Sequence, residues 1–229
     1  METWVTLAET ALSYDGRQAA LAAVAAARKA FDEGPWPHTS PAERIAVVEA
    51  FSGLYAARLG EMADLITTEM GAPTSFSNLA QSPAPWMQIE AFLAIAREFP
   101  WEASRPGALG SDVVVRHEPV GVVAAIPPWN VPQFTVLSKV IPALLTGCTI
   151  VVKPAPETPL DCYLLAELLV EAGVPEGVVS IVAASAPAGT PTGTRDVEVV
   201  GCEERPRRSN RWPVASPPIH TARIAMSAA

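Results

Sequence analysis

The sequence predicts an α/β fold in which N-terminal helices are followed by an open parallel sheet. The first part of the 229-residue chain has apolar residues at helical spacing, whereas β-branched runs begin at Asp112. From residue 148 the pattern of a strand, a helix and a second strand follows in order. This is a βαβ crossover, which we expect to be right-handed with parallel strands.

Two helices are indicated by composition. Residues 17 to 33 are alanine-rich, and Gly34 with Pro35 ends the run. Residues 84 to 98 carry an apolar stripe, which is typical of a helix that packs against a core. Trp86, Ile89, Leu93 and either Ala94 or Ala96 form that stripe.

A further helical region starts with a recognisable cap. Ser40 precedes Pro41 and is followed by Glu43 three residues later, which is the pattern of a capping box. The periodic apolar residues behind it continue to Gly71. We therefore expect one long helix or two abutting helices here.

The β-branched region contains the runs 113 to 117 and 120 to 126, which fit two strands or a bent hairpin. Pro132 suits the first turn of a helix that ends at Gly147. The crossover comprises a strand at 148 to 152, a helix from Pro159 with Thr158 as N-cap and Asp161 in its first turn, and a strand at 178 to 182. The residues expected to form the buried face of the helix that starts at Pro132 are Phe134, Leu137, Ile141, Leu144 and Leu145.

Composition narrows the classes of function. The formal net charge of −8 disfavours nucleic acid and anionic membranes as partners. The longest uncharged run contains four prolines, so no transmembrane helix is expected. The three cysteines lack the spacing of a disulfide framework, which favours a reducing, cytoplasmic location. Neither they nor the scattered histidines show metal-ligand spacing, so no metal site is predicted.

Two polar residues stand where strands of the predicted sheet end. Asn130 belongs to the segment IPPWNVP, and Lys153 to the segment TIVVKP. In open α/β sheets, ligands bind in the crevice beyond the carboxyl ends of the strands. Asn130 and Lys153 are therefore candidates for contact with a cofactor or a substrate.

The strings EPVGVVAAIPPWNVP and GCTIVVKPAPETPL resemble the cofactor-domain signature of the NAD(P)-dependent aldehyde dehydrogenase superfamily. The resemblance covers residues about 10 to 182, which is less than half of a complete family member. It implies N-terminal helices plus an incomplete Rossmann-like parallel sheet of the aldehyde dehydrogenase type. Residues 1 to 182 would form the N-terminal part of the cofactor-binding domain, with an oligomerisation strand near 112 to 118. Aldehyde oxidation to a carboxylic acid and a homo-oligomeric assembly are implied in the same way.

The resemblance also assigns roles to particular residues. Asn130 would donate to the oxyanion of the covalent intermediate, although an asparagine here could instead cap the following helix. Lys153 would bind ribose hydroxyls or a phosphate, and the alternative is a solvated strand end. The residues that would line the nicotinamide side of the groove, or alternatively serve only in packing, are Ile126, Pro127, Pro128 and Trp129.

The choice of cofactor rests on the residues after Lys153. Many family members carry an acidic residue directly after the motif's Lys-Pro-Ala, whereas here Pro156 follows Ala155 and Glu157 comes one position later. A carboxylate at that place would bind a ribose diol and disfavour a 2′-phosphate. We expect NAD, and NADP stays open. The chain has no G-x-G-x-x-G motif to support either. Ala155 and Glu157 are counted with Lys153 among the residues expected to bind the cofactor.

Residues 183 to 229 differ sharply in composition from the preceding body. They hold six arginines, six prolines and no lysine, without sustained periodicity. We expect a non-family tail that is disordered, and we hypothesise a frameshift near residue 183, with a genuine disordered tail as the alternative. The arginine cluster 205 to 211 fits a solvated tail better than a nucleic-acid patch.

The family's reactive cysteine and catalytic glutamate are not recognisable in the sequence. Cys148 opens a buried strand, Cys162 lies near a helix N-terminus, which would lower its pKa, and Cys202 adjoins Glu203 and Glu204. None of the three matches the nucleophile. The chain as written is therefore expected to be an inactive, truncated family member. The alternatives are a non-catalytic nucleotide-binding or subunit-interaction fragment and a pseudogene product.

Overall fold

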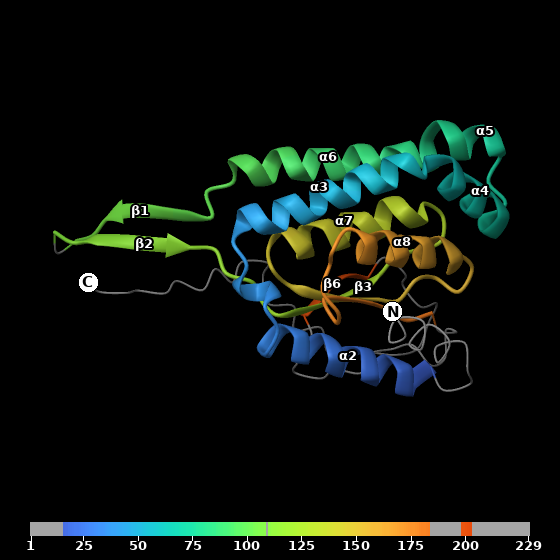
Figure 1. Ribbon diagram of the computed structural model, residues 1–229. Coiled ribbons are helices and arrows are strands. Elements are labelled where there is room, and N and C mark those ends of the chain that lie inside the picture. Colours follow the sequence, from blue (N-terminus) through green and yellow to red (C-terminus); the bar gives the residue numbers. More distant parts are fainter. Residues whose placement is uncertain (1–15, 109, 184–197, 203–229) are drawn as a thin grey trace.

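The computed structural model describes residues 16–108, 110–183 and 198–202, and shows the predicted α/β fold (Figure 1). The helices are α2 (Gly16–Asp32), η1 (Trp36–His38), α3 (Pro41–Ala57), α4 (Leu59–Met70), α5 (Thr74–Phe76), η2 (Ser77–Gln81), α6 (Pro83–Glu98), α7 (Pro132–Leu145) and α8 (Leu160–Glu171). The strands are β1 (Glu102–Pro106), β2 (Asp112–Arg116), β3 (Val122–Ile126), β4 (Thr149–Val152), β5 (Val179–Ile181) and β6 (Glu198–Cys202). None of the helices within these ranges is long and apolar enough to cross a membrane.

The main sheet has the strand order β5-β4-β3-β6, and all of its neighbouring pairs are parallel. The expected crossover from β4 through α8 to β5 is thus present with parallel strands. In register, Val122 lies beside Thr149 and Ala125 beside Val152. The carboxyl ends of β3 and β4 therefore lie side by side at one edge of the sheet.

Helices cover both faces of this sheet. Figure 1 shows α2 on one side and α7 and α8 on the other, with α3 and α6 forming an outer layer over α7. The alternation of side chains along the strands explains the arrangement. Val122 and Val151 pack with the alanines of α2, whereas Val123, Ile150 and Val152 belong to the larger core beneath α7 and α8.

The helix starts and helix ends predicted for the N-terminal half are confirmed. Ser40 and Glu43 form the predicted capping box, in which the Glu43 backbone N–H donates to the Ser40 hydroxyl at 3.3 Å and the Ser40 N–H donates to the Glu43 carboxylate at 2.7 Å. The periodic run behind it is two abutting helices, α3 and α4. Gly71 ends α4 in the left-handed conformation. In the predicted stripe of α6, Ala96 is buried and Ala94 is exposed.

The β-branched region forms two strands that belong to different sheets. β2 pairs antiparallel with β1, which the sequence analysis did not predict, and β3 enters the main sheet. The bent-hairpin interpretation of 113 to 126 is therefore wrong. The β1–β2 hairpin projects away from the helical layers in Figure 1. All residues of the two strands are exposed or half-buried. β1 therefore lacks the alternation of apolar and polar residues by which a strand is recognised in a sequence.

Two further expectations need correction. Phe134 is 41% exposed, so it does not belong to the buried face of α7, although Leu137, Ile141, Leu144 and Leu145 do. The tail was expected to have no regular structure, but residues 198 to 202 form β6 beside β3. The remaining expectations for residues 184 to 197 and 203 to 229 lie outside the described residues.

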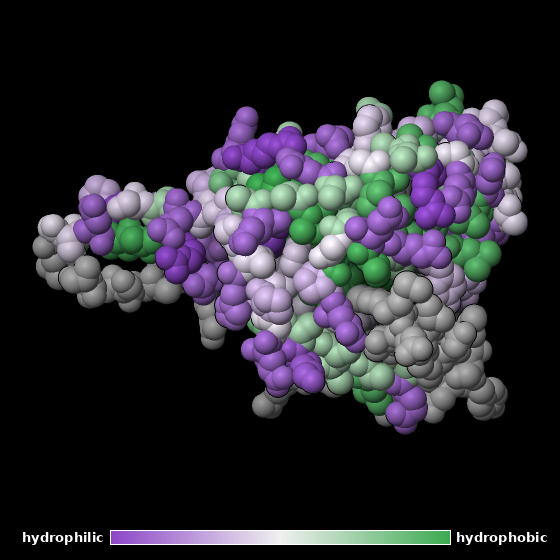
Figure 2. All heavy atoms as spheres, in the orientation of Figure 1, coloured by the Kyte–Doolittle hydropathy of each residue, from purple (hydrophilic) through white to green (hydrophobic). Residues whose placement is uncertain are grey.

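Apolar surface is unevenly distributed over the face drawn in Figure 2. Figure 2 shows apolar residues in several separate places over the helical layers, whereas polar residues dominate the base of the β1–β2 hairpin. The exposed apolar residues of the α5–α6 region are Phe76, Leu79, Met87 and Ile95.

We predict that Gly177→Ala destabilises the chain more than Gly173→Ala. Both glycines have positive φ, so each alanine carries the cost of a left-handed backbone, about 1–2 kcal/mol. Only at Gly177 would the new Cβ clash, at 2.9 Å from the Ala30 Cβ and 3.1 Å from the Ala26 carbonyl oxygen of α2. Overpacking of this kind adds about 1–3 kcal/mol. Urea unfolding followed by circular dichroism measures both losses, and equal losses would contradict the close packing of α2.

Candidate functional site

The two candidate segments meet at the carboxyl edge of the main sheet. Residues 127 to 131 connect β3 to α7, and residues 153 to 159 connect β4 to α8. The Lys153 backbone N–H donates to the Ala125 carbonyl at 2.8 Å, so the lysine begins its loop directly beside the end of β3. The structure thus brings together the two loops that the motifs singled out.

Asn130 is exposed in the first of these loops. The N-cap of α7 is Val131, and α7 has no side-chain cap, so the capping alternative for Asn130 is wrong. Its backbone carbonyl accepts a hydrogen bond from Gln81 Nε2 at 3.2 Å, which connects the loop to η2. The chain therefore holds the backbone of Asn130 while the residue stays exposed, and a hydrogen-bond donor to a ligand requires this accessibility.

The neighbours of Asn130 differ in burial. Pro127 is buried, Ile126 and Pro128 are half-buried, and Trp129 is 45% exposed. The segment therefore runs from the core at the end of β3 out to the surface at Trp129. A partly exposed apolar surface of this kind is able to contact a planar ring, and its role as a wall remains a prediction.

The second loop begins at Lys153, which is half-buried and has a polar or charged partner. Ala155 is buried, whereas Pro156 and Glu157 are exposed. A half-buried lysine is not the freely solvated strand end of the alternative interpretation. Glu157 lies on the surface four positions beyond Lys153, and its contact with a ribose stays a prediction.

The start of α8 differs from the prediction. Its N-cap is Pro159, and no side chain of the flanking loop caps it, so the assignment of Thr158 is wrong. Instead, both carboxylate oxygens of Glu69 on α4 accept backbone hydrogen bonds at this helix end, one from Leu160 N–H and one, at 3.0 Å, from Asp161 N–H. Burial raises the pKa of Glu69, and these two hydrogen bonds act in the opposite direction. Because Glu69 lies 91 residues before Leu160, no local pattern could have revealed this cap.

The cysteines of the described residues lack the properties of a nucleophile. Cys148 and Cys162 are both buried free thiols. Burial raises the pKa of Cys162 well above its ordinary value, and the neighbouring Asp161 raises it further. The expectation that its place near a helix N-terminus lowers this pKa is therefore wrong, because desolvation outweighs the helix terminus. The side chain of Cys202 lies outside what the structure describes.

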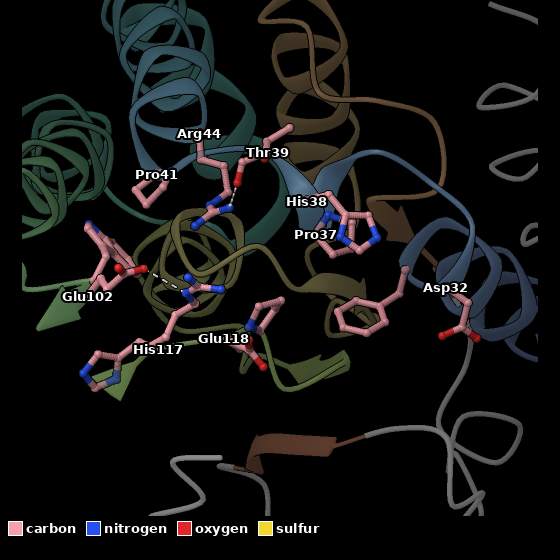
Figure 3. Close-up of a pocket in the computed structure, with 13 residues that line it drawn as sticks. Asp32, Pro37, His38, Thr39, Pro41, Arg44, Glu102, His117 and Glu118 are labelled. Carbon is pink, nitrogen blue, oxygen red and sulfur yellow. Dashed lines mark hydrogen bonds and ion pairs between the residues drawn. The ribbon is translucent and has the colours of Figure 1, made fainter. Parts of the chain in front are cut away.

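A separate cleft of about 650 Å³ lies at the base of the β1–β2 hairpin (Figure 3). Arg44 lines it, with its Nε donating to the Leu145 carbonyl at 2.8 Å, and Arg116 pairs with Glu102 at 2.9 Å. Neither Asn130 nor Lys153 lines this cleft. No group of three or more His, Cys, Asp or Glu in the described ranges could hold a metal ion.

A family model described as "Aldehyde dehydrogenase family" matches residues 8 to 199. The chain belongs to the aldehyde dehydrogenase family. The match extends beyond residue 182, where the change of composition placed the end of the family-like part. An aldehyde dehydrogenase is an oxidoreductase, so the predicted class of protein is confirmed.

Relatives among characterised aldehyde dehydrogenases match the same part of the chain. The 3-succinoylsemialdehyde-pyridine dehydrogenase of a Pseudomonas species is 41% identical over 166 residues, which cover 72% of this chain and 33% of that protein. The geranial dehydrogenase of Castellaniella defragrans is 36% identical over 158 residues, or 69% of this chain and 33% of that one. This chain therefore spans about a third of the length of the relatives it matches.

The fold agrees with solved aldehyde dehydrogenase structures. A Mycobacterium tuberculosis aldehyde dehydrogenase complexed with NAD+ superposes with a TM-score of 0.72 and 44% identity, covering 75% of this chain and 35% of that chain. A Bartonella henselae aldehyde dehydrogenase gives a TM-score of 0.68 and 38% identity, covering 73% and 35%. The predicted α/β fold with a parallel sheet of the aldehyde dehydrogenase type is thus confirmed.

We predict that Glu69→Ala lowers the free energy of unfolding by about 1 kcal/mol, because the first turn of α8 loses its only described cap. Glu69→Gln should lose less, since the amide oxygen still accepts one of the two hydrogen bonds. The exposed Glu171→Ala, at the other end of α8, serves as the control and should change the free energy by less than about 0.5 kcal/mol. A Glu69→Ala chain as stable as this control would show that the cap has no energetic role.

Proposed function

We propose that this chain supplies the oxyanion donor and part of the nucleotide site of an aldehyde dehydrogenase that oxidises an aldehyde to a carboxylic acid with NAD. The observation that carries the proposal is the exposed Asn130 side chain, which α7 does not use as a cap, on the sheet edge that also carries Lys153. Membership of the family supports it. Its substrate would be a small aldehyde.

The role of Asn130 follows from the charge that aldehyde oxidation creates. When a thiolate attacks an aldehyde carbon, the carbonyl oxygen becomes an oxyanion, and a fixed N–H donor stabilises it more than it stabilises the neutral substrate. The Asn130 amide provides two such N–H groups. The hydrogen bond from Gln81 to its backbone carbonyl limits the movement of the loop that carries it. Asn130 would accordingly act on the reaction rate more than on substrate binding.

The residues beside Asn130 fit a nicotinamide dinucleotide. The Lys153 ammonium would donate to ribose hydroxyls or a phosphate, Glu157 would accept from a ribose hydroxyl, and the Trp129 segment would contact the nicotinamide side. When bound, the cofactor accepts the hydride that leaves the substrate carbon. Because Glu69 already occupies the N-terminus of α8, that helix end is not available to a phosphate of the nucleotide. NAD is the proposed cofactor, and the displaced acidic position at Glu157 leaves NADP as the alternative.

The thiolate and the base for hydrolysis would have to come from outside residues 1 to 182. Cys148 and Cys162 are buried, and the pKa of Cys162 is raised. Losing a nucleophile removes nearly all covalent catalysis. We accordingly propose that the 229 residues alone do not oxidise aldehydes.

The projecting β1–β2 hairpin favours a second function, which is association with another subunit. It is a two-stranded sheet that stands clear of the helical layers in Figure 1, and short exposed ribbons of this kind present free edges for pairing. The region near 112 to 118 would then contribute the oligomerisation strand. A chain without catalytic activity could still bind nucleotide or a complete subunit in this way.

The proposed role of Asn130 can be tested in a chimera that joins residues 8 to 182 of this chain to the remainder of the Pseudomonas dehydrogenase. We expect the chimera to form NADH from the aldehyde named for that relative. Asn130→Ala should lower kcat by about 10²–10³-fold, because one oxyanion donor is lost. The control Asn78→Ala, an exposed residue whose side chain donates a hydrogen bond to the Thr74 carbonyl, should leave kcat unchanged. The 229-residue chain alone should form no NADH.

Three results would contradict the proposal. An active chimera whose rate is insensitive to Asn130→Ala would remove the oxyanion role. Aldehyde oxidation by the 229-residue chain alone would show that it has its own nucleophile. A folded chimera without activity would show that this N-terminal part cannot serve in a dehydrogenase.

A further inference from the structure

A cluster of buried polar side chains lies among α3, α4, α7 and α8, away from the solvent-facing site. Asp161 and Gln133 are fully buried, and Tyr55 is nearly so. Both carboxyl oxygens of Asp161, both amide atoms of Gln133 and the Tyr55 hydroxyl complete no hydrogen bond with any residue that the structure describes. Buried polar groups are almost always paired, so five unpaired atoms in one region require an explanation.

These groups are close enough to influence one another. Burial, and after it the charge of Glu69 on α4, raises the pKa of Asp161 to about 7. Polar contacts with Cys162 and Gln133 lower the pKa of Asp161, although Gln133 does not complete a hydrogen bond. Tyr55 on α3 has a raised pKa, because of its burial and then of Asp161. The groups facing Asp161 are therefore an anion, a phenol, a thiol and an amide.

The protonation state of Asp161 decides whether Asp161 and Gln133 can satisfy each other's hydrogen-bond donors and acceptors. A neutral carboxyl group has one O–H donor and one carbonyl acceptor, and an amide has N–H donors and a carbonyl acceptor. The Asp161 O–H can thus donate to Gln133 Oε1 while Gln133 Nε2 donates to the other Asp161 oxygen. An ionised carboxylate is an acceptor only, so it offers no donor to Gln133 Oε1. Within the pair itself, only the protonated form of Asp161 satisfies both groups.

We propose that Asp161, in its protonated form, makes a reciprocal acid–amide pair with the equally buried Gln133, and that this pair positions the two loops of the candidate site. Gln133 lies in the first turn of α7, three residues after Asn130. Asp161 lies in the first turn of α8, directly after the loop that begins at Lys153. The pair therefore joins the two helix starts from the interior side, whereas Gln81 holds Asn130 from η2.

The positioning role rests on the proposed function of Asn130, but the pair itself does not. Asp161 and Gln133 are positioning residues, since they would act through the backbone that carries Asn130. Ionisation of Asp161 removes the donor to Gln133 Oε1 and brings a second negative charge close to Glu69. The start of α7 should then change its position or mobility as the pH rises through neutrality.

The test is a nitrogen-15 NMR titration of the full chain from pH 5 to pH 9. We expect the side-chain amide signals of Gln133 to move with a midpoint near pH 7, and those of Asn130 to move with the same midpoint. In Asp161→Asn, an amide–amide pair forms at every pH, so both movements should disappear. Asp64→Asn, at an exposed position of α4, should leave both titrations unchanged.

Urea unfolding of the same variants gives an independent measurement. Because the pKa of Asp161 is raised in the folded state, the folded chain binds the proton more tightly than the unfolded chain between about pH 4 and pH 7. Its contribution to stability is fully present below that window and is lost as the pH rises through it. The urea midpoint of Asp161→Asn relative to the parent chain should therefore increase across this window and stay constant above it.

The possible outcomes separate the parts of the proposal. Gln133 signals that do not titrate, or that titrate equally in Asp161→Asn, would overturn the acid–amide pair. Titrating Gln133 signals with unmoved Asn130 signals would overturn the positioning role. Neither measurement uses aldehyde or nucleotide, so a failure of the proposed function leaves both readouts interpretable.

Discussion

The close packing of α2 on the sheet is the constraint on which the remaining structure depends. A parallel sheet whose strands are buried on both sides needs a helix on each face. Here α7 and α8 cover one face, and among the described residues α2 packs on the β3–β4 part of the other. Ala19, Ala23 and Ala27 recur every four residues and let the helix backbone approach the strands, and the Thr149 hydroxyl donates to the Ala27 carbonyl at 3.0 Å. Without this cover, the edge that holds Asn130 and Lys153 would not be fixed.

Electrostatics at the start of α8 adds a second constraint. Two carboxyl groups approach this helix end, and their environments give them different roles. Glu69 is only half-buried, and two backbone N–H donors and the positive end of the helix dipole partly offset the burial that raises its pKa. Asp161 is fully buried and feels the charge of Glu69, so its ionised form is disfavoured. Two carboxyl groups with raised pKa values thus meet at one helix terminus, and the arrangement depends on the distant α4.

The features that sequence analysis identified are those encoded by neighbouring residues. The capping box at Ser40, proline at the start of α7 and glycine after it each act within one helical turn, so their residue types suffice to predict them. The loops with Asn130 and Lys153 could be located because strands and helices alternate around them. The missed features are long-range: Glu69 reaches across 91 residues to cap α8, and Gln81 across 49 to hold Asn130. β1 escaped prediction because an exposed strand has no apolar alternation, and Phe134 was misassigned because helical spacing does not reveal which neighbours are present.

The position of α2 has a consequence for how the chain is made. This helix leaves the ribosome before every strand it covers, since β3 begins only at Val122 and β5 ends at Ile181. An alanine-rich helix of this length is marginally stable alone in water. It must therefore persist as a fluctuating segment while more than a hundred later residues are synthesised, and its docking closes a loop of high contact order. Docking of α2 consequently cannot precede the synthesis of the strands that it covers, and factors that bind nascent chains would encounter its apolar stripe before the sheet does.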